Sequence, residues 1–516
     1  MTSAAQASGA SDEKEAAQEE AAAAFLEEDR AAGSPWVVLS VTTVGALLAS
    51  VQGSALIIAL PKILTALRID FLTIMWVLLG YLLITTALVP IAGRLADMVG
   101  RKRLYVSGFV LFTAGSLLAG LAQPQFHGLD LIGARLVQGI GGAFLISISA
   151  VLVTDAFRHH RVGLGLGVNS VAAAAGFLIG PVVGGVLTAI SWRYVFLVNV
   201  PIGVAGSIWS VWRLREPMVA TLHERFDWLG AVSFVVGLGS LLLALSNLAF
   251  PLLPSAITVV LFPLAVVGLA VFIVTEARFP DPMLDLRLFR NRRFAISGLA
   301  NALNGLARGA VLFILIFFLQ GPYGKDPLTA GLMMAPFGAG FLLVGPLSGF
   351  FSDRLGSRNL ATGGLLVSAA ALFGLSRIDH TTSYLALGSL MFLMGAGSGL
   401  FMSPNTRDLM TAVPISRRGI AAGTGSMLLN TGQMLSISFA FPLVLSKIPQ
   451  AIMFHVFLFG GGMATQPAAL MAFESGIHQA FLVSGGATVV AAAVSALRPA
   501  APAVDPSQAA LAGSSA

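Results

Sequence analysis

The sequence contains no cysteine, which excludes disulfides, thiolate metal sites and cysteine nucleophiles. Charged residues are scarce as well: they make up 10% of the 516 residues, whereas 56% are hydrophobic. A soluble globular domain carries about 25% charged residues, because its surface must be polar. The composition therefore predicts an integral membrane protein.

Signatures of nucleotide-binding and hydrolytic enzymes are also missing. The pattern G-x-x-x-x-G-K-[ST] does not occur, and the single Gly-Lys pair, Gly324-Lys325, is followed by Asp. Neither H-E-x-x-H nor G-x-S-x-G is present, and His159 and His160 lie among basic loop residues. We predict that the protein is not an enzyme and needs neither a metal nor another cofactor.

Long apolar runs account for most of the chain. Each is long enough to cross the hydrocarbon core as a helix, which takes about 20 residues. They are rich in Leu, Ala and Gly and lack the short alternating pattern of an outer-membrane barrel. We predict an all-α fold with fourteen spans, at residues 37–59, 71–93, 104–123, 129–153, 162–189, 194–214, 229–250, 255–275, 295–319, 328–351, 360–378, 384–404, 420–445 and 479–497.

The basic residues are distributed unevenly between the two sides of the predicted bundle. Most of them follow even-numbered spans, whereas the opposite connections carry only Lys62, Arg68, Arg193, Lys325, Arg377 and Lys447. Cytoplasmic loops are enriched in Lys and Arg, so we expect both termini in the cytoplasm of a prokaryotic cell, whose cytoplasmic membrane the chain spans. The net charge of +6 then reflects topology, and nucleic-acid binding is not expected.

A repeated motif relates two parts of the chain. Asp97 in GRLADMVGRK has a counterpart at Asp353 in GFFSDRLGSR, and each lies between the second and third spans of a predicted six-span half. We predict an acidic tail at residues 1–35, an N-terminal six-helix half at 36–216, a linker with two inserted spans at 217–293, a C-terminal half at 294–498 and a second tail at 499–516.

Four motifs in the first half resemble the major facilitator superfamily. Gly93-x-Leu95-Ala96-Asp97-x-x-Gly100-Arg101-Lys102 is similar to its motif A, and Leu131-x-x-x-Arg135-x-x-Gln138-Gly139-x-Gly141 to its motif B. The antiporter motif C resembles Gly176-x-x-x-Gly180-Pro181-x-x-Gly184-Gly185 in span 5. With Trp192-Arg193-Tyr194-x-Phe196 and the two extra spans, the chain resembles the fourteen-span drug:proton antiporter branch, which includes the multidrug exporters.

The resemblance implies a rocker-switch exporter and assigns roles to the motif residues. In the family, the motif A Asp holds one state by contact with a helix N-terminus of the second half, so Asp97 is expected to act as a gate latch near Gly419. The alternative is that Arg101 and its basic neighbours only fix topology. The motif C residues, Gly176, Gly180, Pro181, Gly184 and Gly185, are expected to form a close helix contact and a bend.

The same resemblance places a central substrate cavity between spans 1, 4, 9 and 12. Asn301, Asn304 and Arg308 share one face of span 9, because their spacing is i, i+3, i+7. Interhelical hydrogen bonding is the alternative role for the two asparagines. The other cavity candidates are Gln52 and Ser54 in span 1, Arg135 and Gln138 in span 4, and Ser403 and Asn405 in span 12.

The chain departs from the family at span 1, where Val51-Gln52-Gly53-Ser54 replaces the usual membrane Asp, and no acidic residue lies deep within any span. Proton coupling must then use a boundary group or be missing. Asp155 is the first candidate, and its pairing with Arg407 would close the cytoplasmic side; Asp97, Arg101 and Asp353 complete the gating set. Because Arg135 and Arg308 have no buried carboxylate opposite them, we hypothesise a preference for anionic, zwitterionic or neutral amphiphiles.

The function predicted from the sequence is secondary active export of amphiphilic, drug-like small molecules across a bilayer, with protons as the expected coupling ion and a monomer as the expected assembly. One alternative is an exporter of lipid-like or anionic amphiphiles that does not couple through a span 1 carboxylate. A receptor or a channel is a further alternative of a different class. Saturable flux with counterflow would distinguish the transporter from both.

Overall fold

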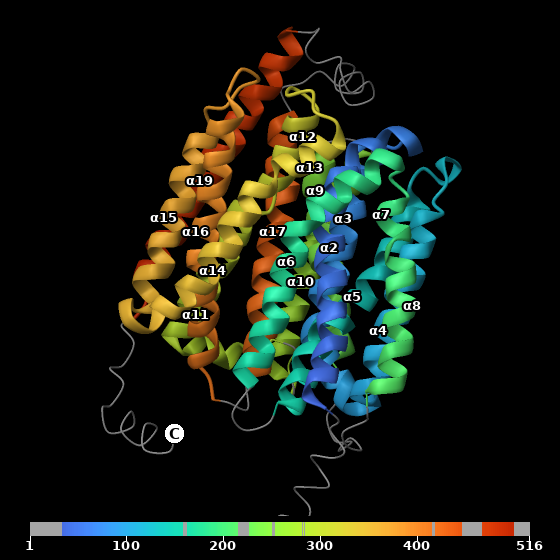
Figure 1. Ribbon diagram of the computed structural model, residues 1–516, viewed down its shortest axis with the longest axis vertical. Helices are drawn as coiled ribbons and strands as arrows, with labels where there is room; N and C mark the ends of the chain where they lie inside the picture. The colour runs from blue at the N-terminus through green and yellow to red at the C-terminus, as the bar shows by residue number, and fades with distance from the viewer. Residues whose placement is uncertain are drawn as a thin grey trace, which may run out of the picture.

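The computed structural model describes residues 34–157, 162–214, 227–249, 253–280, 282, 284–414, 418–445 and 467–499. Within these residues all regular structure is helical (Figure 1). The expected all-α fold is therefore confirmed. Most of the two predicted tails and of the long connection after span 13 lies outside the described residues.

Where the structure describes it, the first part of the chain forms seven helices and one short 3-10 turn. They are α2 (Pro35–Leu67), α3 (Phe71–Val99), α4 (Arg101–Gly120), η1 (Pro124–Phe126), α5 (Leu129–Ala156), α6 (Val162–Ile190), α7 (Tyr194–Leu197) and α8 (Asn199–Arg213). Two helices follow, α9 (Trp228–Ala249) and α10 (Ser255–Arg278), and then the short turn η2 (Leu286–Arg290).

In the last part of the chain, the described residues form eight helices. They are α11 (Arg292–Arg308), α12 (Val311–Gln320), α13 (Pro327–Met333), α14 (Ala335–Leu355), α15 (Ser357–Leu375), α16 (Tyr384–Thr411), α17 (Arg418–Leu445) and α19 (Pro467–Ala496). The last predicted span thus begins at Pro467 rather than near residue 479, so His478 lies inside a helix, where its Nε2 lies 2.7 Å from the carbonyl oxygen of Ile378.

Twelve helical stretches in the described residues are long and apolar enough to cross a membrane, with α7–α8, α11–α12 and α13–α14 each counted as one stretch. Each of them overlaps one predicted span. The helices α6 and α17 fall at the two remaining predicted spans and have 29 and 28 residues. The chain is thus a multi-pass membrane protein, and the total of fourteen spans stays a prediction.

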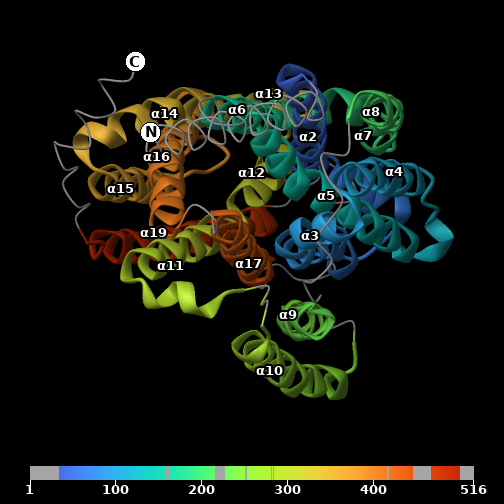
Figure 2. The same cartoon turned by 90° about the horizontal axis from the view of Figure 1, so that it is seen from below.

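The helices gather into two groups with a separate pair beside them (Figure 2). Helices α2 to α8 pack on one another and form the first half, and α11 to α19 form the second half. Helices α9 and α10 pack against each other, and α9 also contacts α3 of the first half and α17 of the second. This inserted pair therefore covers one side of the boundary between the halves.

One group of contacts between the halves lies at one end of the bundle. We call this the distal end, where α2 ends and α13 begins, and the opposite one the proximal end, where α2 begins and α19 ends (Figure 1). At the distal end, Gln320 Nε2 donates to the carbonyl oxygen of Ile58, 3.0 Å away. The rings of Phe71 and Phe317 lie 6.5 Å apart there, and one buried apolar cluster runs through both halves.

Three predicted spans are interrupted, a feature that the apolar runs did not reveal. The α7–α8 and α13–α14 breaks each precede a proline, Pro201 and Pro336, whose missing N–H removes one helical hydrogen bond. The α11–α12 break is not caused by a proline: the two residues between these helices are Gly309 and Ala310. Tertiary packing must produce this third break.

Candidate functional site

Helix α17 contacts the break in span 9, the two residues between α11 and α12. Gly309 has no room for a side chain, because a Cβ there would lie against the backbone of Gln433. The hydroxyl of Ser436 accepts the backbone N–H of Ala310 at 3.0 Å, an N–H that a continuous helix would use internally. Irregular backbone inside a membrane is tolerated where other groups replace the lost hydrogen bonds. Helix α17 therefore stabilises a discontinuous helix near the middle of the span.

Polar side chains without partners surround this break. Asn304 is fully buried, and neither atom of its amide has a hydrogen-bond partner among the described residues. In the same described part of the chain, Asn301 donates to the carbonyl oxygen of Gly425 at 2.8 Å while its Oδ1 stays unpaired, and the Nε of Arg308 is also unpaired. An unsatisfied buried polar group costs about 1–3 kcal/mol. The predicted face of span 9 therefore carries unused hydrogen-bonding capacity.

Arg135 has a different environment. Its Nε donates to the carbonyl oxygen of Val77 at 3.1 Å, its guanidinium donates to Gln138 Oε1, and it lies 4.1 Å from the ring centre of Tyr81. Gln138 in turn donates to Ser116 Oγ at 2.7 Å. This network joins α3, α4 and α5 within the first half. The hydrogen-bonding groups of Arg135 and Gln138 are used inside the bundle, in contrast to those of Arg308.

The two candidates in α2 face other helices of their own half. Gln52 is buried and accepts a hydrogen bond from Asn199 Nδ2 at 2.6 Å, while its own Nε2 is unpaired among the described residues. Ser54 lies where α6 approaches α2, because a Cβ at Gly180 would overlap its hydroxyl. The structure thus places Ser54 in a helix contact and leaves one donor of Gln52 unused.

The two candidates in α16 also lie at helix contacts. Ser403 faces Gly349 of α14, and Asn405 is buried and accepts a hydrogen bond from Arg498 Nη2. The Nδ2 of Asn405 has no partner in the described part of the chain. The structure does not bring these two residues together with Arg135 in one network.

The motif C glycines pack in two directions. Gly176, Gly180 and Gly184 face the backbone of α2, whereas Gly185 faces Pro327 and Leu328 at the start of α13, in the other half. The carbonyl of Pro181 lies against Gly331 of α13. The predicted packing motif therefore contacts its own half along one face and the second half at the distal end.

The repeated motif forms the same turn twice. Gly100 separates α3 from α4 with φ +108°, and Gly356 separates α14 from α15 with φ +82°. Both values lie in a region that favours glycine, so a tight turn between consecutive helices explains the residue at each position. The side chains of Asp97 and Asp353 lie outside the described set, and their contacts stay predictions.

Comparison with known proteins decides the family. The profile of the Major Facilitator Superfamily matches residues 42–437 and, in an overlapping match, residues 297–515. The chain belongs to the major facilitator superfamily.

Relatives within the superfamily narrow the branch. The chain is 33% identical over 389 residues to multidrug resistance protein Stp of Mycobacterium tuberculosis, covering 75% of this chain and 72% of Stp. It is 28% identical over 405 residues to riboflavin transporter RibZ of Clostridioides difficile, covering 78% of this chain and 87% of RibZ. Together with Stp, multidrug transporter protein MdtP of Bacillus subtilis, at 30% identity over 75% of this chain and 71% of MdtP, confirms the resemblance to the multidrug exporter branch.

Solved structures agree on the fold. The crystal structure of a bacterial homologue of the human lysosomal transporter Spinster, in an inward-facing and unoccupied conformation, superimposes with a TM-score of 0.66. The match covers 90% of this chain and 96% of that one at 16% sequence identity. At this identity the match establishes the major facilitator fold alone. The two groups of helices seen in Figure 2 are the two halves of that fold.

The superfamily motif A supplies one ion pair at the proximal end. Arg101, at the start of α4, pairs with Asp155, at the end of α5, and both side chains are partly exposed at 30% and 20%. The sequence suggested that Asp155 pairs with Arg407. The structure pairs Asp155 with Arg101 instead, because the antiparallel packing of α4 and α5 brings their ends together. Arg407 lies 3.4 Å from the hydroxyl of Ser352.

A buried charge cluster braces the proximal end of the second half. Asp408 in α16 is 1% exposed and accepts hydrogen bonds from Arg293 of α11, Ser357 of α15 and Arg498 after α19. Arg498 is also 1% exposed, and its Nη1 lies 3.1 Å from the carboxylate. Burial lowers the pKa of Arg498 below its usual range, and Asp408 opposes that shift. The cluster joins four helices through one carboxylate.

The sequence did not reveal this cluster. Arg407 is one of the predicted gating residues, whereas the adjacent Asp408 is not among them. The acidic residue three positions before the end of α16 and the arginine after the last predicted span were the available signals. Their separation in sequence concealed the contact. Among the described residues, no group of three or more His, Asp or Glu side chains is placed to hold a metal ion.

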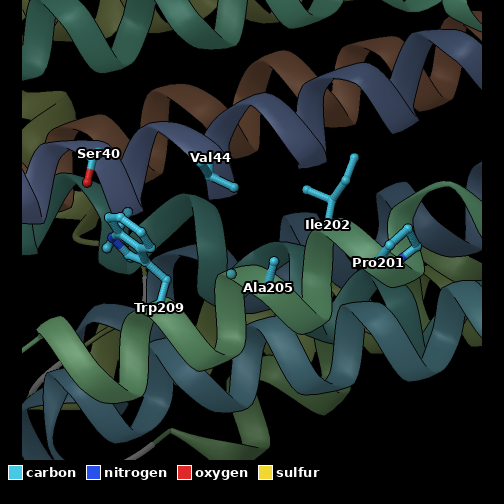
Figure 3. A pocket seen from close by; sticks show the side chains of 8 residues that line it. Ser40, Val44, Pro201, Ile202, Ala205 and Trp209 are labelled. Atoms are coloured by element: carbon cyan, nitrogen blue, oxygen red, sulfur yellow. The ribbon is translucent and has the colours of Figure 1, made fainter.

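An apolar groove lies on the outside of the first half, between α2 and α8 (Figure 3). It has a volume of about 500 Å³ and is lined by Ser40, Val41, Val44, Pro201, Ile202, Ala205, Gly206 and Trp209. Val44, Ile202 and Trp209 are exposed, and the lining carries no charged side chain. Such a surface is compatible with hydrocarbon, but it offers no partner for the polar group of an amphiphile.

Asp326 caps α13 at the distal end and gives a prediction about pH. Its carboxylate accepts hydrogen bonds from the hydroxyl and backbone N–H of Thr329 and from the N–H of Leu328, which hold its pKa below the usual value. A depressed pKa means that the capping contribution is complete above the ordinary carboxyl pKa of about 3.9 and is lost as pH falls through the lowered value. We expect the difference in thermal stability between the native chain and Asp326→Ala to stay constant from pH 5 to 8. A difference that changes within that range would contradict the assignment.

Proposed function

We propose that the protein is a secondary active transporter that exports amphiphilic small molecules across the prokaryotic cytoplasmic membrane by alternating access. The observation that carries the proposal is the pairing of a closed distal end with unused polar groups at the α11–α12 break. Discontinuous helices near the middle of the membrane are typical of substrate sites in secondary transporters. Its relatives include a riboflavin transporter and a multidrug resistance protein, which supports a small-molecule substrate.

Topology follows from charge in this proposal. Fourteen spans place both termini on one side, and the excess of Lys and Arg after even-numbered spans makes the proximal end cytoplasmic. The distal contacts between the halves are then extracellular. The domain boundaries given above and a monomeric assembly belong to the same proposal.

Gating in this proposal depends on charges at the cytoplasmic end. Asp97 and Asp353 would contact helix ends when the halves close there, and Arg101 with Asp155 would position the first of these loops. Proton coupling would then use Asp155, because the described acidic side chains all lie near helix ends or in loops. Arg407 remains the proposed cross-half partner in the opposite conformation.

The test is substrate flux in proteoliposomes, measured with a fluorescent amphiphile with and without an imposed pH gradient. We expect saturable uptake that increases with the gradient and shows counterflow. Binding without flux would indicate a receptor, and flux without counterflow would indicate a channel. Saturable flux that does not depend on the pH gradient would exclude proton coupling but would still support a transporter.

A second measurement tests alternating access directly. Because the chain has no cysteine, Ile58→Cys with Gln320→Cys introduces the only two thiols. The Gln320 side chain reaches the backbone of Ile58 across the halves. We expect a short bifunctional thiosulfonate reagent to join them and abolish flux, and reduction to restore at least half of it. The single Gln320→Cys variant is the control. Flux that continues through the cross-linked protein would show that the distal end does not open.

A further inference from the structure

The α11–α12 break brings unused polar groups of two side chains close together. Arg308 ends α11, and α12 begins three residues later, after Gly309 and Ala310. The Nε of Arg308 is unpaired among the described residues, and the buried Asn304, one turn before it on the same face, adds an unpaired amide. A guanidinium and an amide therefore lie beside the break.

No carboxylate neutralises this region in the described part of the chain. The acidic side chains of the helices packed on α11 are Asp408 in α16 and Glu474 in α19, which are engaged by Arg498 and His380 near the two ends of the bundle. Among the polar groups that α17 turns toward α11, the hydroxyl of Ser436 is used by Ala310 and the carbonyl of Gly425 by Asn301. The positive charge at the break therefore lacks a counter-ion of its own.

Arg135 and Arg308 differ in whether their hydrogen-bonding groups are already used within the protein. Arg135 uses a carbonyl, an amide and an aromatic ring of its own half. Arg308 makes no such contact, and its Nε is unpaired among the described residues. Interaction of Arg308 with the dipole of its own helix C-terminus accounts for its charge, but it leaves the Asn304 amide unexplained. A ligand that accepts hydrogen bonds explains both.

We infer that the α11–α12 break binds the anionic group of the exported molecule, so that the substrates are amphiphiles with a carboxylate, sulfonate or phosphate head. Two oxygens of such a group can accept two parallel N–H bonds from one guanidinium, and Asn304 Nδ2 supplies a further donor. The apolar body is left to contact the aromatic side chains of α12, where Phe313 and Phe317 stack at 4.8 Å. The inference rests on the proposed transport function for its physiological meaning, but the binding site itself does not require transport.

The experiment uses two probes with one apolar body. Pyrenebutyrate carries a carboxylate, and a pyrenebutyl trimethylammonium salt carries the opposite charge. Binding to the purified full chain is followed by pyrene fluorescence, and flux is followed in proteoliposomes. The variants are Arg308→Gln, Arg308→Lys and Asn304→Ala. The control is Arg193→Gln, which changes an arginine that donates to the carbonyl of Ala122 at the distal end.

We expect the native chain to bind pyrenebutyrate at least tenfold more tightly than the cation. Arg308→Gln should remove that preference, Asn304→Ala should weaken anion binding severalfold, and Arg308→Lys should retain part of it because the charge stays while the fork is lost. Arg193→Gln should bind like the native chain. Anion binding unchanged in a folded Arg308→Gln protein, or a native preference for the cation, would overturn the inference. Anion binding that depends on Arg308 without any flux would uphold the site and remove the proposed transport function.

Discussion

Replacing Asp408 with alanine is expected to lower the free energy of unfolding by about 3–5 kcal/mol. The carboxylate is the partner of Arg498, which is as deeply buried as Asp408 itself, and it also receives Arg293 and Ser357. Without it, a buried guanidinium would keep its charge and lose its partner. Because the cluster joins α11, α15, α16 and α19, the loss should appear as one large shift of the thermal transition measured in detergent micelles.

Two further variants make this prediction specific. Asp155→Ala removes the carboxylate of the partly exposed pair with Arg101, so we expect a loss below about 1 kcal/mol. Asp408→Leu combined with Arg498→Met replaces the two fully buried charges, and it should recover a large part of the stability lost in Asp408→Ala, because the Arg293 that remains is partly exposed, at 20%. An Asp408→Ala protein as stable as the Asp155→Ala protein would show that the cluster is not a brace.

The second large effect is expected at Gly331, where an added methyl group should block transport without unfolding the protein. A Cβ at Gly331 would overlap the carbonyl oxygen of Pro181 in the other half, and a Cβ at Gly184 would overlap that of Ala55 in the same half. The two clashes are equally close, but only the first can be relieved by separating the halves. Gly331→Ala should therefore disfavour the distally closed state, whereas Gly184→Ala should disturb the fold itself.

These outcomes can be measured on the same preparations. A destabilisation of the closed state by about 2.8 kcal/mol changes its population ratio a hundredfold, so flux should fall at least tenfold in Gly331→Ala. Its thermal transition should stay within a few degrees of the native one, and a single thiol at Gln320→Cys should react faster with a membrane-impermeant reagent. Gly184→Ala should instead lower the transition temperature. Equal loss of stability in both variants would argue against halves that separate.

Much of the fold was predictable because the length of an apolar run depends only on consecutive residues of the sequence. Each apolar run had to become a helix, since the membrane offers the backbone no other hydrogen-bond partners. The breaks were less visible. Pro201 and Pro336 mark two of them in the sequence, but the α11–α12 break depends on Gln433 and Ser436 of α17, which no local pattern connects to Gly309.

The residues of the candidate site were also predictable only in part. The face of Asn301, Asn304 and Arg308 followed from helical spacing, and the structure places these residues around the break with atoms unpaired. Spacing could not distinguish Arg135 from Arg308, because the partners of Arg135 come from α3 and α4. Nor could it find Asp408, whose partners come from three other helices. Sequence patterns identify the polar residues, and tertiary contacts decide which of them are already satisfied.

The brace around Asp408 also sets an order for biogenesis. A ribosome releases Arg293, Ser357 and Asp408 well before Arg498, which follows the last described helix. Until α19 inserts, the carboxylate has Arg293 and Ser357 as partners but lacks Arg498. The proximal end of the second half is thus complete only once α19 is in place.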